Sequence, residues 1–124
     1  YDLITVTHNE TSTGIRNPIE DIGQILKKYD DVVYCVDTVS SAGGIKIPVD
    51  EIGIDICITS VQKAIGLPPG MSLCTFSEKS RKRAEKVPNR GVYFDLPFNS
   101  IPFTHVRFKL SIRKNLKRRP RKQI

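Results

Sequence analysis

Two apolar runs constrain the fold of this chain more than any other feature of its sequence. They are DVVYCVD (31–37) and IDICITS (54–60). The first is continuous, as expected for a strand covered on both faces, and the second is predicted to be another buried strand. Further strand patterns, DLITVTH (2–8) and GMSLCTFS (70–77), flank them. With helical patterns alternating between strands, the sequence predicts a largely parallel α/β sheet.

The clearest helix signal lies between the first two strands. Asn17 is expected to cap this helix, and Pro18 suits its first position, followed by acidic residues in the first turn. One apolar face is formed by Ile19, Ile22, Ile25, Leu26 and Tyr29. A second helix, polar and exposed, is predicted over EKSRKRAEKV (78–87).

Polar residues follow three of the predicted strands, where ligands of α/β sheets usually bind. They are Thr11, Asp37 and Lys63. A lysine at the rim of an apolar strand can lose its proton through desolvation and attack a carbonyl, and an aspartate beside it suits a cationic ring nitrogen. Hydroxyls and amides of ETSTG (10–14) and VSSAGG (39–44) could bind a phosphate or a phenolic oxygen.

Each of these residues also has an ordinary structural interpretation. Lys63 could be a surface lysine and Asp37 a turn cap. His8 and His105 lack metal-ligand spacing, which favours structural roles. The pattern therefore indicates a site without identifying its ligand.

Charge and cysteine content narrow the class of protein. Residues 1–104 hold 11 basic and 13 acidic residues, whereas residues 105–124 hold 9 basic residues and no acid. The body therefore needs no nucleic-acid partner. No apolar run is long enough to cross a membrane. The cysteines Cys35, Cys57 and Cys74 lie in strand patterns without metal spacing, so we expect buried, reduced thiols and a cytoplasmic location.

Four segments together resemble the class V aminotransferases, with closest likeness to the alanine–glyoxylate and serine–pyruvate branch. They are HNETSTG (8–14), VDTVSSAGG (36–44), DEIGIDICITSVQKAIGLPPG (50–70) and NRGVYFDL (89–96). The resemblance covers residues 1–96 and implies the central part of the large, cofactor-binding domain of a fold-type I pyridoxal-phosphate enzyme. Residues 97–124 form a basic extension unlike the family, which we expect to be weakly structured.

The resemblance also implies roles for individual residues. Lys63 matches the lysine that forms a Schiff base with pyridoxal 5′-phosphate and shuttles the substrate proton. Asp37 matches the partner of the pyridine nitrogen, and Val39 the apolar residue against the ring face. Thr11 matches the hydroxyl near the phenolic oxygen, and Gln62 a contact to the phosphate. Gln62 stands where cysteine desulfurases usually have histidine, which favours aminotransferase activity.

The implied reaction moves an amino group from alanine or serine to a small 2-oxo acid such as glyoxylate or pyruvate, in a homodimer. Because the family's proteins are much longer and supply a substrate-binding arginine from another domain, we expect this chain to be inactive alone. The tail RFKLSIRKNLKRRPRKQI (107–124) leaves another function open: a non-catalytic remnant that binds nucleic acid or acidic surfaces. A relative of the cysteine desulfurases is a further alternative.

Overall fold

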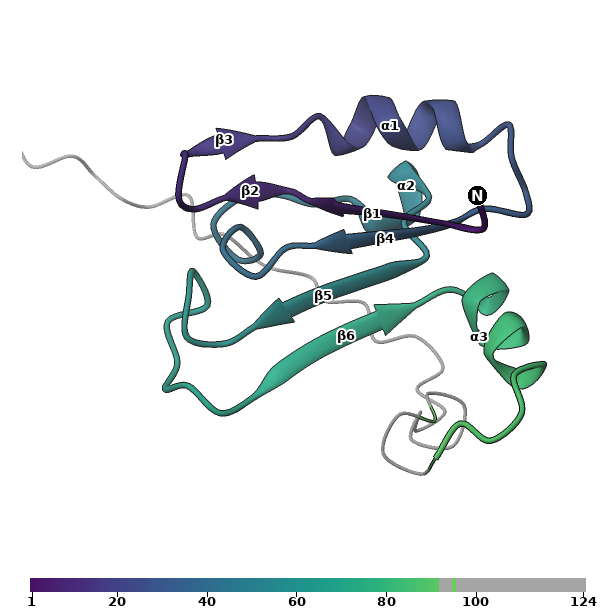
Figure 1. Cartoon of the computed structure of the whole chain (residues 1–124). Helices are drawn as coiled ribbons and strands as arrows, with labels where there is room; N and C mark the ends of the chain where they lie inside the picture. Colours follow the sequence, from purple (N-terminus) through teal and green to yellow (C-terminus); the bar gives the residue numbers. More distant parts are fainter. Residues whose placement is uncertain (92–94, 96–124) are drawn as a thin grey trace, which may run out of the picture.

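A four-stranded sheet with helices beside it forms the centre of the molecule (Figure 1). The computed structural model describes residues 1–91 and 95. The sheet has the order β1-β4-β5-β6, formed by β1 (Leu3–Thr7), β4 (Val33–Asp37), β5 (Ile56–Ser60) and β6 (Ser72–Phe76). The first three strands are parallel and β6 is antiparallel to β5. The predicted, mostly parallel α/β fold is confirmed.

The other elements connect these strands. A short hairpin, β2 (Asn9–Glu10) with β3 (Ile15–Arg16), follows β1. The helices are α1 (Ile19–Leu26), α2 (Val49–Ile52) and α3 (Glu78–Glu85). None of the helices in the described part of the chain is long and apolar enough to cross a membrane. The predicted extension over residues 97–124, with its basic tail and His105, lies outside the described residues.

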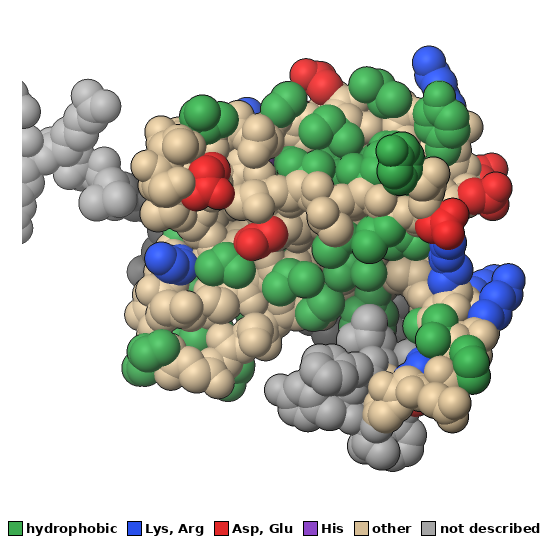
Figure 2. Space-filling view, viewed as in Figure 1, with side chains coloured by type: hydrophobic (Ala, Val, Ile, Leu, Met, Phe, Trp, Pro, Cys, Tyr) green, Lys and Arg blue, Asp and Glu red, His purple; other side chains and the backbone are tan. Residues whose placement is uncertain are grey.

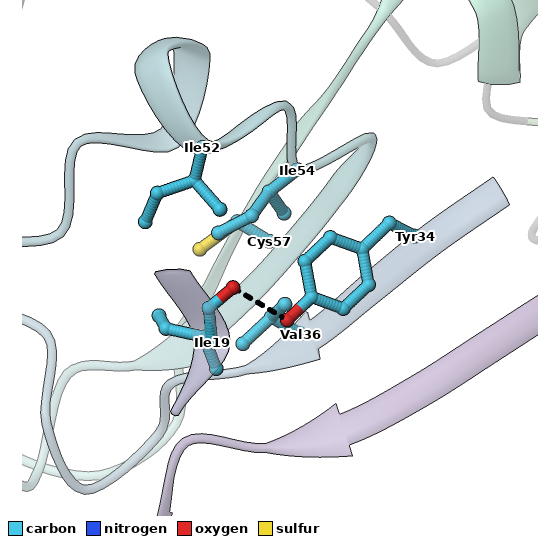
Figure 3. Close-up of a cluster of buried hydrophobic side chains, with 6 residues drawn as sticks. All are labelled: Ile19, Tyr34, Val36, Ile52, Ile54 and Cys57. Atoms are coloured by element: carbon cyan, nitrogen blue, oxygen red, sulfur yellow. Dashed lines mark hydrogen bonds between the residues drawn. The ribbon is translucent and has the colours of Figure 1, made fainter. Parts of the chain in front are cut away.

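The hydrophobic core lies between one face of the sheet and the helices α1 and α2. Its buried members are Ile19, Tyr34, Val36, Ile52, Ile54 and Cys57 (Figure 3). The Tyr34 hydroxyl donates a hydrogen bond of 3.1 Å to the carbonyl of Ile19. Burial, assisted by the negative charge of Glu20, raises the pKa of Tyr34 to about 12. This phenol therefore stays neutral and fastens the start of α1 to the middle of β4.

The opposite face of the sheet is only partly covered. Ile58 on β5 is 38% exposed, Cys74 on β6 is exposed and Cys35 on β4 is half-buried. Figure 2 shows hydrophobic side chains at the surface over the middle of the sheet. Val33, on the same face of β4 as Cys35, is buried, so the expected cover on both faces holds at the start of β4 and is incomplete toward Asp37. Of the three cysteines, only Cys57 is buried. All three are free thiols.

The start of α1 also differs from the sequence prediction. Pro18 occupies the cap position without a side-chain hydrogen bond, so Asn17 does not cap the helix. Asn17 instead donates through Nδ2 to the carbonyl of Thr7 at 2.7 Å, because this partner at the end of β1 lies within its reach. The helix ends at Leu26, and Ile25 and Tyr29 are more than half exposed rather than part of the buried face.

A buried carboxylate organises the end of the sheet from which the parallel strands start. Asp55 accepts hydrogen bonds from the Tyr34 backbone N–H at 2.9 Å and from the Ser77 hydroxyl at 2.6 Å. The Lys79 ammonium lies 2.7 Å from the same carboxylate. Ser77 is also the N-cap of α3, accepting from the backbone N–H of Ser80. Asp55 thereby fixes α3 at the end of the sheet opposite the candidate site.

Candidate functional site

The predicted site residues follow the carboxyl ends of β1, β4 and β5, which meet at one edge of the sheet. Asp37 is the last residue of β4, and its register partners are Thr7 on β1 and Ile58 on β5. Lys63 comes three residues after the end of β5. The topology therefore brings the segments carrying Asp37 and Lys63 to neighbouring positions, as the sequence predicted.

The Asp37 carboxylate is held by its own loop. Its Oδ1 accepts a hydrogen bond of 2.8 Å from the backbone N–H of Val39. The other oxygen, Oδ2, has no partner among the described residues and the side chain is exposed. Asp37 borders a shallow hollow of about 260 Å³ lined by Thr5, Val6, Thr7, Cys35 and Ile58. Asp37 is thus both the turn cap and a carboxylate with one oxygen available to a ligand.

Lys63 lies in a tight turn directly after β5. Its carbonyl accepts from the Gly66 backbone N–H at 2.9 Å, and the Leu67 N–H donates to the Val61 carbonyl at 3.0 Å. The side chain of Lys63 is exposed, and within the described part of the chain its amine has no hydrogen bond or ion pair. The burial on which the desolvation argument depends is not supplied by these residues.

Gln62, the neighbour of Lys63, is also exposed, but its amide is oriented by a hydrogen bond. The Ser60 hydroxyl donates to Gln62 Oε1 at 2.5 Å. Thr11 lies at the tip of the β2–β3 hairpin, exposed and without a hydrogen bond from its hydroxyl to any described residue. Three predicted site residues, Thr11, Gln62 and Lys63, therefore present polar groups that the fold itself does not use.

Side-chain hydrogen bonds join the loop after β1 to the loop after β4. Asn9 Nδ2 donates to Ser40 Oγ at 2.9 Å, and Ser40 Oγ donates to the Asn9 carbonyl at 2.8 Å. Beside this pair, His8 Nδ1 lies 2.9 Å from Ser41 Oγ, and the His8 backbone N–H donates to the Asp37 carbonyl at 2.8 Å. The hydroxyls of Ser40 and Ser41 therefore position the loop that follows Asp37, and binding of a phosphate or phenolic oxygen by this segment stays a prediction.

The hydroxyls of the ETSTG segment are largely used within that segment. Ser12 donates from both its backbone N–H and its hydroxyl to Glu10 Oε1, at 3.0 and 2.7 Å. These two bonds, the hydroxyl first, lower the pKa of Glu10. Thr13 contacts the Glu10 carbonyl at 3.5 Å. Of the three hydroxyls in this segment, only that of Thr11 is left for a ligand.

His8 is fully buried and has a structural place between two loops. Desolvation lowers its pKa, and the positive charge of Arg16 adds to this, while the negative charge of Glu20 opposes it. Its Nε2 has no hydrogen-bond partner. The described residues contain no group of three or more potential metal ligands around it or elsewhere. The geometry supports the interpretation of His8 as structural.

Glycines allow the loop after β4 to pack against the Lys63 loop. A Cβ atom on Gly43 would lie 3.2 Å from Ile65 Cγ1 and 3.4 Å from the backbone of Ala64. A Cβ atom on Gly44 would lie 3.2 Å from the Ala64 Cβ. Because Ala64 directly follows Lys63, this packing sets the Lys63 turn against the Asp37 loop. The adjacent glycine pair after a strand end is the sequence signal for this close packing.

Comparisons with known proteins agree with this arrangement. Residues 1–100 match the family model described as aminotransferase class-V. An uncharacterized aminotransferase of Methanocaldococcus jannaschii is 52% identical over 97 residues, covering 75% of this chain and 24% of that relative. The alanine–glyoxylate aminotransferase of Oryctolagus cuniculus is 38% identical over 96 residues, covering 76% of this chain and 24% of that relative.

Solved structures show the same fold. The ureidoglycine–glyoxylate aminotransferase from Bacillus subtilis matches with a TM-score of 0.70 and 35% identity, covering 77% of this chain and 25% of that one. The chain thus spans about a quarter of the length of the proteins it matches. These similarities confirm both the resemblance noted in the sequence and the expected fold-type I architecture.

Proposed function

Because this chain belongs to the class V aminotransferase family, we propose that it carries the cofactor-binding part of an aminotransferase that uses pyridoxal 5′-phosphate. The observation that carries the proposal is a set of unused polar groups at one sheet edge: Asp37 Oδ2, the Lys63 amine and the Gln62 amide nitrogen. An acceptor, a nucleophilic amine and a donor are what the ring nitrogen, aldehyde and phosphate of this cofactor require.

Each residue has a separate task in this proposal. When bound, the cofactor withdraws electrons from the substrate bond that breaks. Asp37 Oδ2 would accept a hydrogen bond from the protonated ring nitrogen, while the Val39 backbone N–H holds Oδ1. The Val39 side chain would pack against the ring. Lys63 Nζ would hold the cofactor and, as a free amine, would take and return the substrate proton. Gln62 donates to the phosphate and Thr11 to the phenolic oxygen.

We propose a small amino donor, alanine or serine, and a small 2-oxo acid acceptor such as glyoxylate or pyruvate. Two of the similar proteins are named for glyoxylate as a substrate, which supports this acceptor. The Gln62–Lys63 pair also favours amino transfer over the desulfurase alternative. We further infer a homodimeric whole protein, in which other segments cover the open sheet face and bury Lys63.

Titration with pyridoxal 5′-phosphate tests this proposal. We expect a visible absorption band that survives gel filtration in the wild type and is lost in Lys63→Ala. Lys46→Ala is a matched control, because Lys46 is also an exposed loop lysine without a side-chain partner in the described part of the chain. A band that persists in Lys63→Ala, or is absent from the wild type, would contradict cofactor binding by this chain at Lys63.

A further inference from the structure

Ser60 and Gln62 form a side-chain pair that the expected cofactor contacts do not account for. Ser60 is the last residue of β5, paired in register with Ser72 on β6. Its hydroxyl donates to Gln62 Oε1 at 2.5 Å. Because Ser60 is fixed by the strand and is half-buried, this bond anchors the outer end of an otherwise exposed side chain.

The direction of the hydrogen bond decides what Gln62 presents to a ligand. A carboxamide has an acceptor oxygen and a donor nitrogen, and it can present either by rotating. With Oε1 occupied by the Ser60 hydroxyl, the exposed group is Nε2, which donates to no other described residue. An amide held in this way offers two N–H donors to an anion and keeps its own oxygen away from negative charge.

We propose that Ser60 is a positioning residue that orients Gln62 as a donor to the phosphate of the cofactor. This inference rests on the proposed function, since it needs a phosphate beside Gln62. Without the Ser60 hydroxyl, the amide rotates freely and presents its oxygen to the phosphate part of the time. Loss of the Ser60 hydroxyl therefore weakens binding of the phosphate group and leaves binding of the pyridine ring unchanged.

The decisive measurement compares two ligands, pyridoxal 5′-phosphate and pyridoxal, which differ only in the phosphate. Dissociation constants are measured with the full chain for the wild type and for Ser60→Ala, Ser60→Thr, Gln62→Ala and Ser72→Ala. Ser72 is the matched control, because it is the register partner of Ser60 on the neighbouring strand β6. It is exposed and makes no side-chain hydrogen bond to a described residue. We expect Ser60→Ala to weaken binding of the phosphorylated ligand about three- to tenfold, the range of one hydrogen bond's net contribution.

The other variants separate orientation from general damage. Pyridoxal should bind Ser60→Ala as it binds the wild type, Ser60→Thr should restore the preference because it keeps the hydroxyl, and Ser72→Ala should change nothing. If Gln62→Ala loses the phosphate preference and Ser60→Ala keeps it, the inference is overturned and the proposed function stands. An equal loss for both ligands in Ser60→Ala would also overturn it, because it would indicate damage to the strand end.

A measurement without cofactor provides a second readout. Inorganic phosphate is titrated into the chain while the Gln62 side-chain amide signals are followed by ¹⁵N NMR. We expect these signals to shift with phosphate in the wild type and in Ser60→Thr, and to shift less in Ser60→Ala. Equal shifts in all three proteins would contradict orientation by Ser60. Failure of the wild type to bind any of these phosphates would instead reject the proposed function together with the inference.

Discussion

Replacing Gly43 by alanine tests how the loop after β4 is held against the Lys63 turn. Gly43 has a φ of +93°, a conformation that alanine adopts only with strain of about 1–2 kcal/mol. Its new Cβ would also meet Ile65 Cγ1 at 3.2 Å, a contact that a flexible side chain can relieve by a small movement. Alanine restricts the unfolded chain and returns about 0.4–1 kcal/mol. The net expectation is a loss of about 0.5–1.5 kcal/mol, set mainly by the backbone.

Two other glycines separate the backbone strain from the contact. Gly14 has a φ of +72° and open space around its Cβ position, so Gly14→Ala carries strain without contact. Gly44 lacks a positive φ but would place its Cβ 3.2 Å from that of Ala64, so Gly44→Ala carries contact without strain. We expect Gly14→Ala to cost about 0.5–1 kcal/mol and Gly44→Ala to stay within about 0.5 kcal/mol of the wild type.

Urea unfolding measures all three free energies. We follow it by far-ultraviolet circular dichroism, because the chain has no tryptophan for fluorescence. Cofactor affinity, measured in parallel, should fall in Gly43→Ala, where the displaced loop contacts the Lys63 turn, and should fall less in Gly44→Ala. Two results would refute the reasoning that backbone conformation dominates. One is a free energy of unfolding for Gly43→Ala equal to that of the wild type, and the other is an equal loss in Gly44→Ala and Gly43→Ala.

Three further predictions concern the core and the buried polar groups. Tyr34→Phe should cost about 1 kcal/mol in urea unfolding through loss of the hydrogen bond to Ile19. It should also reduce the wild type's loss of stability between about pH 10 and 12, where the unfolded Tyr34 phenol ionises more readily than the buried one. The free energy of unfolding should also fall as the pH drops below about 6.5, because His8 binds a proton more readily in the unfolded chain than when it is buried. His8→Gln should flatten this pH dependence, and an unchanged pH dependence would count against His8 as its cause. Asp55→Ala should lower the free energy of unfolding by about 2–4 kcal/mol, because it leaves buried hydrogen-bond donors without an acceptor. Lys79→Ala removes only a partly exposed partner and should cost about 1 kcal/mol or less. Equal costs would show that the ion pair dominates.

The largely parallel sheet and the position of the site were predictable because both depend on local patterns and one topological rule. The apolar runs fixed the strands ending at Asp37 and Ser60, and parallel strands bring their carboxyl ends to one edge. The residues that join the loops were not predictable in this way. Ser40 and Ser41 find partners 31 and 33 residues earlier in the chain, and no spacing rule connects residues that far apart.

The errors have the same physical origin. Asn17 has the right residue type for a helix cap, but its side chain reaches the carbonyl of Thr7, a partner that the local sequence does not reveal. The run 31–37 is apolar enough for a strand buried on both faces, but hydrophobicity alone does not say which polypeptide segment covers each face. In both cases, contacts between residues far apart in the sequence decide the outcome: which partner Asn17 binds, and how far each face of the strand is covered.

The buried Asp55 carboxylate and the Lys63 turn occupy opposite ends of β5, about 20 Å apart at the usual rise per residue of a strand. No hydrogen-bond partner is shared between the groups described at these two ends. Substitutions at one end should therefore change the free energy of unfolding independently of substitutions at the other, so that their effects add. Stability gained around Asp55 can then offset losses in the ligand-facing loops, which leaves those loops free to acquire new specificities during evolution while the sheet stays folded.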